Sequence, residues 1–189
     1  MNEIISSLLT SAGLGIGAGI NAYATLLVFG ALARWRPGMF QGELADFFAS
    51  TPVLIVVGVL YAIEFLADKV PTIDHVWDVI HTFIRPIAGA LVAWGAASHQ
   101  VPKGALIMAA VIGGGAALTS HAAKATVRAG STMTTAGAAN PVLSVIEDLF
   151  AFVNAAVAVF FPWLVLLLIA AMALVMIAIM RRVRKPQTF

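Results

Sequence analysis

Long apolar runs constrain this chain more than any other feature. There are six of them, at 8–33, 52–68, 71–98, 104–129, 141–161 and 162–180, and polar segments or a proline mark their boundaries. A run of about 20 apolar residues can cross the hydrocarbon core of a bilayer as a helix. Only 11 % of the 189 residues are charged and 61 % are hydrophobic, whereas a soluble domain has about 25 % charged residues. We therefore expect one integral membrane domain over residues 1–189, folded as an all-α bundle of about six spans.

The two ends of the chain indicate its orientation. The residues before the first run include Glu3 but no lysine or arginine, so they lack the basic region of a signal peptide and the run at 8–33 is expected to be an uncleaved helix. A basic cluster at 181–185 follows the last run. Because short basic flanks are retained in the cytoplasm, we expect a multi-pass protein with a cytoplasmic C-terminus.

Proline and glycine divide the runs further. Pro86 lies inside the third run and either kinks a helix there or begins a new segment, so Pro-broken or re-entrant half-helices of the kind found in transporters are expected. Segment 39–50 mixes phenylalanine and leucine with acidic residues, which predicts an amphipathic helix in the membrane interface. The stretches 71–78 and 141–148 resemble each other. They favour an internal repeat with halves at 8–98 and 103–183.

Ionisable side chains gather in a few places despite the apolar composition. In the third run they fall at i, i+4, i+7 and i+11, which places them on one helix face: Asp74, Asp78, His81 and Arg85. The fourth run has a basic stripe of His121, Lys124 and Arg128. Charges are costly inside a membrane, so they indicate either a ligand or ion path or an internally paired seam that locks helices together.

A cytoplasmic tail and six crossings would bring these groups to one side. The ends of the second and fourth runs and the starts of both Pro-led helices would then lie in the inner half of the bundle. Acids of the Pro-led helices, Asp78 above all, are expected to meet Lys124 or Arg128. The candidate ion- or substrate-binding residues are Asn21, Glu64, Asp68, Asp74, Asp78, His81, Arg85, Lys124, Arg128, Glu147 and Asp148.

Other features limit the partners. Gly15 and Gly19 form a G-x-x-x-G pair, which allows close helix approach and predicts a homo-oligomer through this face. The chain has no cysteine, and its four scattered histidines form no metal-binding motif, so we expect neither a metal nor another cofactor. Membrane lipids are the expected surroundings, and nucleic acid is not an expected partner because the one basic patch is typical of a headgroup anchor.

Several sequence blocks resemble a bacterial membrane family known as domain of unknown function four-one-two-six. They are GINAY at 19–23, EFLADKVP at 64–71, DHVWD at 74–78, HTFIRP at 81–86, NP at 140–141 and EDL at 147–149. The resemblance implies a multi-span protein of the bacterial inner membrane. It implies no activity, substrate or catalytic residue.

Three functions fit these residues. The first is a small transporter or channel coupled to protons or cations, with Asp78 and Asp148 as coupling carboxylates and the basic residues attracting a small anionic solute or lipid headgroup. The second is a structural or assembly protein held together by small-residue packing. The third is a membrane-embedded enzyme, which we do not favour because the sequence has no G-x-S-x-G, H-E-x-x-H or P-loop motif.

Overall fold

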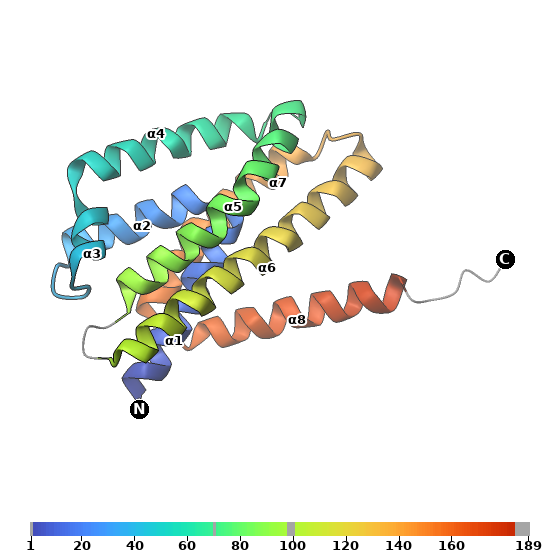
Figure 1. Ribbon diagram of the computed structural model, residues 1–189. Coiled ribbons are helices and arrows are strands. Elements are labelled where there is room, and N and C mark those ends of the chain that lie inside the picture. The colour runs from blue at the N-terminus through green and yellow to red at the C-terminus, as the bar shows by residue number, and fades with distance from the viewer. Residues whose placement is uncertain (1, 70, 98–100, 184–189) are drawn as a thin grey trace.

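The computed structural model describes residues 2–69, 71–97 and 101–183, and its regular elements in those ranges are all helices. This confirms the all-α prediction. The bundle is shown in Figure 1. Its helices are α1 (Asn2–Ile20), α2 (Ala22–Trp35), α3 (Glu43–Ala49), α4 (Thr51–Ala67), α5 (Pro71–Ala96), α6 (Lys103–Thr135), α7 (Asn140–Phe160) and α8 (Leu164–Val183).

Membrane crossing is supported by helix length and composition. Among the described residues, four segments are long and apolar enough to span a bilayer: Asn2–Ile20, Val79–Ala96, Lys103–Thr135 and Asn140–Phe160. A fifth is added if α3 and α4, which meet at a 65° bend, count as one broken span. The apolar helices Ala22–Trp35 and Leu164–Leu174 are shorter than a span. Four or five candidate spans are roughly consistent with the six expected.

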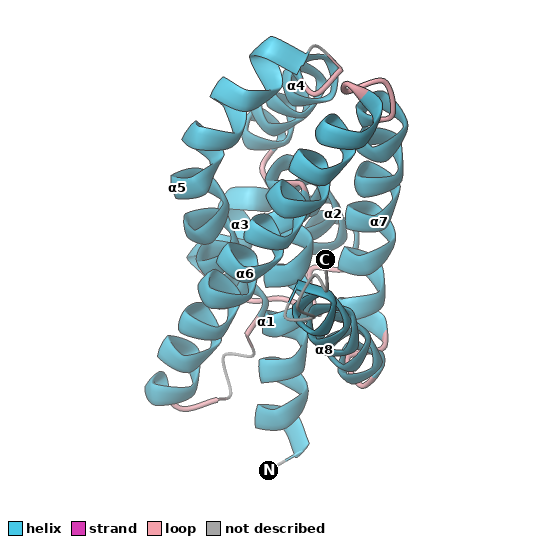
Figure 2. Cartoon of the chain, turned by 90° about the vertical axis from the view of Figure 1, so that its right-hand side faces the viewer, coloured by secondary structure: helices cyan, strands magenta, loops and turns pink. Residues whose placement is uncertain are grey.

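Helix α1 is the centre of the bundle. Figures 1 and 2 show α5, α6 and α7 packed around it, and every residue from Thr10 to Gly19 is buried. Glycines permit this approach, since a methyl group on Gly15 would collide with the backbone of Gly113 in α6. The expected homo-oligomer through Gly15 and Gly19 is therefore wrong in its choice of face, because α6 of the same chain already covers it.

The first apolar run is not one helix. At Asn21 the backbone is extended (φ −145°, ψ 109°), and its side-chain Oδ1 accepts a hydrogen bond from the Ala24 N–H at 2.9 Å. Asparagine is a favoured N-cap because its side chain satisfies a free N–H of the new helix. The chain turns there, and α2 runs back so that Phe40 and Asn2 line the same cavity. This break differs from the expected half-helices, which were placed at Pro86, and α1 before it is long enough to cross a bilayer by itself.

Pro86 does not divide the third run. Helix α5 continues from Pro71 to Ala96 with Pro86 inside it. A proline removes one helical hydrogen bond, but packing against a neighbouring helix can stabilise the segment. Here α6 supplies that packing: Gly89 lies against Gly113 and Ala117. The prediction of a break at Pro86 is therefore wrong.

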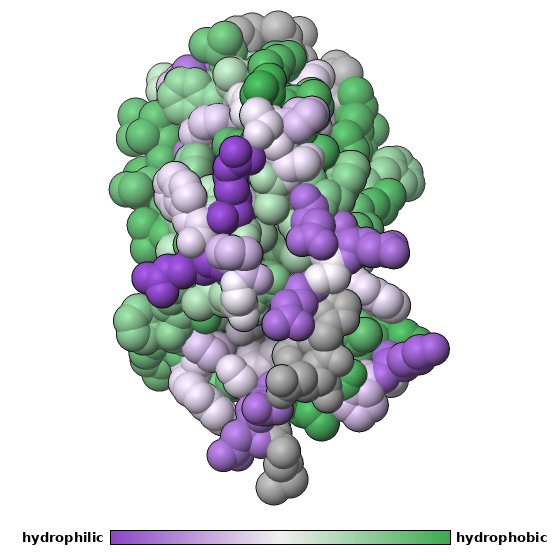
Figure 3. Space-filling view, turned by 90° about the vertical axis from the view of Figure 1, so that its left-hand side faces the viewer, coloured by the Kyte–Doolittle hydropathy of each residue, from purple (hydrophilic) through white to green (hydrophobic). Residues whose placement is uncertain are grey.

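The remaining helices cover the sides of the bundle. In segment 39–50, Phe40 and Phe48 are buried against Phe29 of α2, with ring centroids 5.0 Å and 5.9 Å away. Helix α8 leaves the bundle at a steep angle and is seen almost end-on in Figure 2. Figure 3 shows the face at the left of Figure 1, where polar side chains gather centrally and apolar ones follow the margins. That distribution suits a bundle whose flanks contact lipid.

Candidate functional site

A layer of charged side chains lies where several helices end or begin. It combines the end of α4, the middle of α5, the last half of α6 and the first half of α7. The structure thus brings together residues that were expected to meet: Glu64, Asp68, His81, Arg85, Lys124, Arg128, Glu147 and Asp148, joined by Asn21 at the α1–α2 break. The side chains of Asp74 and Asp78 lie outside the described residues. The ion pairs that were expected between these acids and Lys124 or Arg128 therefore lie outside them as well.

The first ionic group is centred on Arg85. This side chain is fully buried, and its Nη2 lies 2.9 Å from Glu64 Oε1, which is also fully buried. The same guanidinium contacts the His121 ring, whose Nε2 is 3.0 Å from the Thr82 hydroxyl. His81 Nε2 lies 3.7 Å from Glu64 Oε1. A buried carboxylate and guanidinium held this way neutralise each other without water.

The second ionic group joins α4, α6 and α7. Arg128 Nη2 is 2.8 Å from Asp68 Oδ2, and its Nε is 3.1 Å from Glu147 Oε2. Lys124 Nζ lies 3.3 Å from Glu147 Oε2 and 3.5 Å from Asp68 Oδ2. Its shortest contact is a hydrogen bond of 2.9 Å to the carbonyl of Ile20. The basic stripe of the fourth run therefore meets acids of two other elements.

Asp68 stays ionised in this group. Burial alone would raise the pKa of its carboxyl, but the charges of Lys124 and Arg128 outweigh that effect and hold the pKa below its ordinary value. A lowered pKa in the folded state means that the carboxylate stabilises the fold above the ordinary pKa of about 3.9, and that this stability is lost only as the pH falls through the lowered value.

This gives a prediction for acid unfolding. Asp68→Asn should lower the unfolding midpoint in mild detergent, and the difference from the wild type should stay constant between pH 7 and pH 5. It should shrink only below about pH 4, where the carboxylate of the unfolded chain begins to take up a proton while the native one stays ionised. A difference that already disappears at pH 5 would contradict the assigned ion pairs.

Asp148 differs from the other acids because its described partner is neutral. The carboxyl is 5 % exposed, and its Oδ1 accepts a hydrogen bond of 2.7 Å from the Asn21 side-chain amide. Its Oδ2 has no hydrogen-bond partner in the described part of the chain. The hydroxyl of Ser144, one turn earlier in α7, is fully buried and likewise without such a partner. A buried carboxyl without a paired cation can take up a proton or bind a cation.

A row of polar groups leads from Asn21 along α1, and the sequence reasoning missed it. Asn154 of α7 donates to the Gly13 carbonyl at 2.7 Å, and the Thr25 hydroxyl donates to the Asn21 carbonyl at 3.0 Å. Gly17 leaves the space in which these two side chains approach. The signal was present, since polar or small residues recur every three or four positions along this stretch: Ser7, Thr10, Gly13, Gly17, Asn21 and Thr25.

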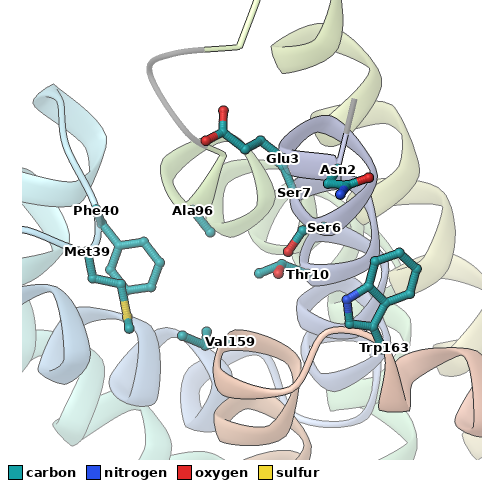
Figure 4. A pocket seen from close by; sticks show the side chains of 10 residues that line it. All are labelled: Asn2, Glu3, Ser6, Ser7, Thr10, Met39, Phe40, Ala96, Val159 and Trp163. Atoms are coloured by element: carbon teal, nitrogen blue, oxygen red, sulfur yellow. The ribbon is translucent and has the colours of Figure 1, made fainter.

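The row begins at a cavity of about 560 Å³ at the opposite end of the bundle from the charged layer. Figure 4 shows the hydroxyls of Ser6, Ser7 and Thr10 next to one another on α1, with aromatic and aliphatic side chains around them. From Ser7 to Asn21 is about 21 Å along a helix. The lining residues are Asn2, Glu3, Ser6, Ser7, Thr10, Met39, Phe40, Ala96, Val159 and Trp163.

The comparisons with known proteins identify a family without a known activity. The family described as domain of unknown function (DUF4126) matches the chain over residues 8–182. The chain belongs to this family. No curated protein and no solved structure matches it. The DUF4126 match includes the whole charged layer and the row along α1 except Ser7. In the described part of the chain, no three acidic or histidine side chains are placed to hold a metal ion.

Proposed function

We propose that this protein is a small transporter or channel of the bacterial inner membrane that moves protons, alone or with a solute, through Asp148. The observation that supports this most is the carboxyl of Asp148: it is buried in an apolar bundle and held by the neutral amide of Asn21. Ionisable groups inside a membrane bundle commonly mark ion and proton pathways. The helix break at Asn21 adds to this, because transporters form their binding sites at broken helices.

The polar row along α1 supplies the route in this proposal. Protons would enter at the cavity, pass the hydroxyl and amide groups between Ser7 and Asn154, and reach Asp148 beside the Asn21 break. Asp148 itself belongs to the charged layer at the other end of the bundle. With a cytoplasmic C-terminus, that layer would face the cell interior.

An anionic solute or lipid headgroup, which the sequence suggested, is less well supported than a proton. Arg85, Lys124 and Arg128 each contact a carboxylate. An anion would have to displace one of these carboxylates, which would leave a buried charge unpaired at a cost of several kcal/mol. The proposal therefore centres on proton or cation uptake by Asp148.

A structural role is the second candidate, and a specific observation favours it. The close backbone approach of α1, α5 and α6 and the paired charges would equally suit a rigid scaffold. The two functions differ in what Asp148 does, because a scaffold needs only its hydrogen bond to Asn21 and not its ability to exchange a proton.

Proton flux into liposomes tests the proposal. Asp148→Asn preserves the shape of the side chain but cannot release a proton, so the purified variant should fold, while proton uptake measured with an enclosed pH-sensitive dye should fall at least tenfold. Asp46→Asn is the matched control, since Asp46 is exposed on α3 and should leave the flux unchanged. If Asp148→Asn keeps the wild-type flux, or if the wild type shows none above empty liposomes, the scaffold role replaces this one.

A further inference from the structure

The surroundings of the Lys124 ammonium resemble a binding site for a free cation. Helix α1 ends at Ile20 because Asn21 is extended, so its last carbonyls lack the helical N–H donors that would otherwise follow. Lys124 Nζ donates to the Ile20 carbonyl at 2.9 Å. The C-terminal end of a helix also carries a partial negative charge. In transporters, carbonyls at such broken ends coordinate metal cations.

The other neighbours of the ammonium are also oxygen atoms. Glu147 Oε2 lies 3.3 Å from Lys124 Nζ and Asp68 Oδ2 lies 3.5 Å from it. Carbonyl and carboxylate oxygens are the ligands that hard cations prefer. The three oxygens come from α1, α7 and the end of α4, whereas the lysine comes from α6. The lysine side chain is only 1 % exposed, so these oxygen atoms take the place of water around its ammonium group.

The charged side chains around the Lys124 ammonium determine the charge of the cation that this site would bind. Asp68 and Glu147 contribute two negative charges, and Arg128, which contacts both, contributes one positive charge. Without Lys124 the group would carry one net negative charge, which a single monovalent cation would balance. An ammonium group is similar in size to a potassium ion, so the space left would suit a monovalent ion or a small primary ammonium.

We propose that Lys124 is a tethered cation: its ammonium occupies a monovalent-cation site formed by the Ile20 carbonyl, Asp68 and Glu147. The chain thereby fills with its own side chain a place where other membrane proteins bind a free ion. It follows that the wild type does not need sodium or potassium at this point, and that shortening Lys124 opens a site for them. The inference depends on Lys124 alone and holds whether or not Asp148 takes up protons.

Unfolding of Lys124→Ala in different chloride salts tests this proposal. The variant is compared in sodium, potassium, methylammonium and choline chloride at equal concentration, which keeps screening constant. At ten times its dissociation constant, a cation that binds only the folded state lowers the unfolding equilibrium constant about tenfold. We expect that decrease for at least one of the three small cations relative to choline, and equal stability of the wild type in all four salts.

Two further variants make the result decisive. Lys69→Ala is the matched control, because Lys69 Nζ donates to the Phe65 carbonyl and lies over the Phe65 ring, with no carboxylate partner among the described residues. It should gain no dependence on the cation. Lys124→Ser also vacates the ammonium position and leaves a small polar side chain on α6, so it is the second test variant. Equal stability of both Lys124 variants in all four salts, or failure to recover either in any of them, would overturn the proposal.

Discussion

Replacing Arg85 by methionine should lower the free energy of unfolding by about 3–5 kcal/mol, because it leaves a carboxylate buried without its cation. Arg85 and Glu64 are both fully buried and 2.9 Å apart. Methionine fills much of the volume of the arginine chain, so a cavity accounts for little of the loss. Most of the loss in the free energy of unfolding comes from the unpaired charge of Glu64, which has no access to water in the native bundle.

A double-mutant cycle separates the energy of the Arg85–Glu64 ion pair from the loss of packing. Arg85→Met and Glu64→Gln are measured alone and together by unfolding in mixed detergent. The double variant should be more stable than the sum of the single effects predicts, by roughly 1–3 kcal/mol. Arg36→Met is the control, since Arg36 is exposed beyond α2 and its loss should change stability by no more than about 0.5 kcal/mol. Additive effects of Arg85 and Glu64 would show that the ion pair does not stabilise the fold.

The charged layer could be predicted from the sequence for a simple geometric reason. Consecutive helices joined by short turns run in opposite directions, so the end of one and the start of the next lie at the same end of the bundle. Glu64 near the end of α4 and His81 in the first half of α5 meet by this rule. The stripe of Lys124 and Arg128 follows from the 3.6-residue helical period alone.

The individual partners could not be predicted in the same way. Arg128 contacts Asp68 and Glu147, and this choice depends on how far each helix is rotated about its axis. That rotation is set by packing of small residues between α1, α5 and α6, which involves the whole bundle.

The helix break at Asn21 could not be predicted from the sequence for a related reason. A single asparagine within an apolar run is compatible with one continuous helix, and the turn is stabilised by tertiary contacts such as the hydrogen bond from Asn21 to Asp148.

The same packing makes two neighbouring glycines of α6 respond in opposite ways to alanine. Gly113 is buried, and a methyl group there would lie 2.5 Å from the Gly89 carbonyl oxygen of α5 and collide with the Ala93 methyl. Because a carbonyl in a helix cannot move without moving its backbone, the two helices would have to separate. Gly113→Ala should therefore lower the free energy of unfolding by about 3 kcal/mol, at the upper end of the usual cost of overpacking.

Gly115 provides the matched comparison within the same helix. Two residues correspond to about 200° of rotation, so it lies on the opposite face of α6. It is exposed, and a methyl group there would meet nothing within 4 Å. Gly115→Ala should leave stability unchanged or raise it by about 0.5–1 kcal/mol, because alanine favours the helix. Unfolding of both variants in the same detergent measures the difference. Equal effects would mean that α5 and α6 do not approach closely at Gly113, and the packing of α1 against both helices would then be wrong as well.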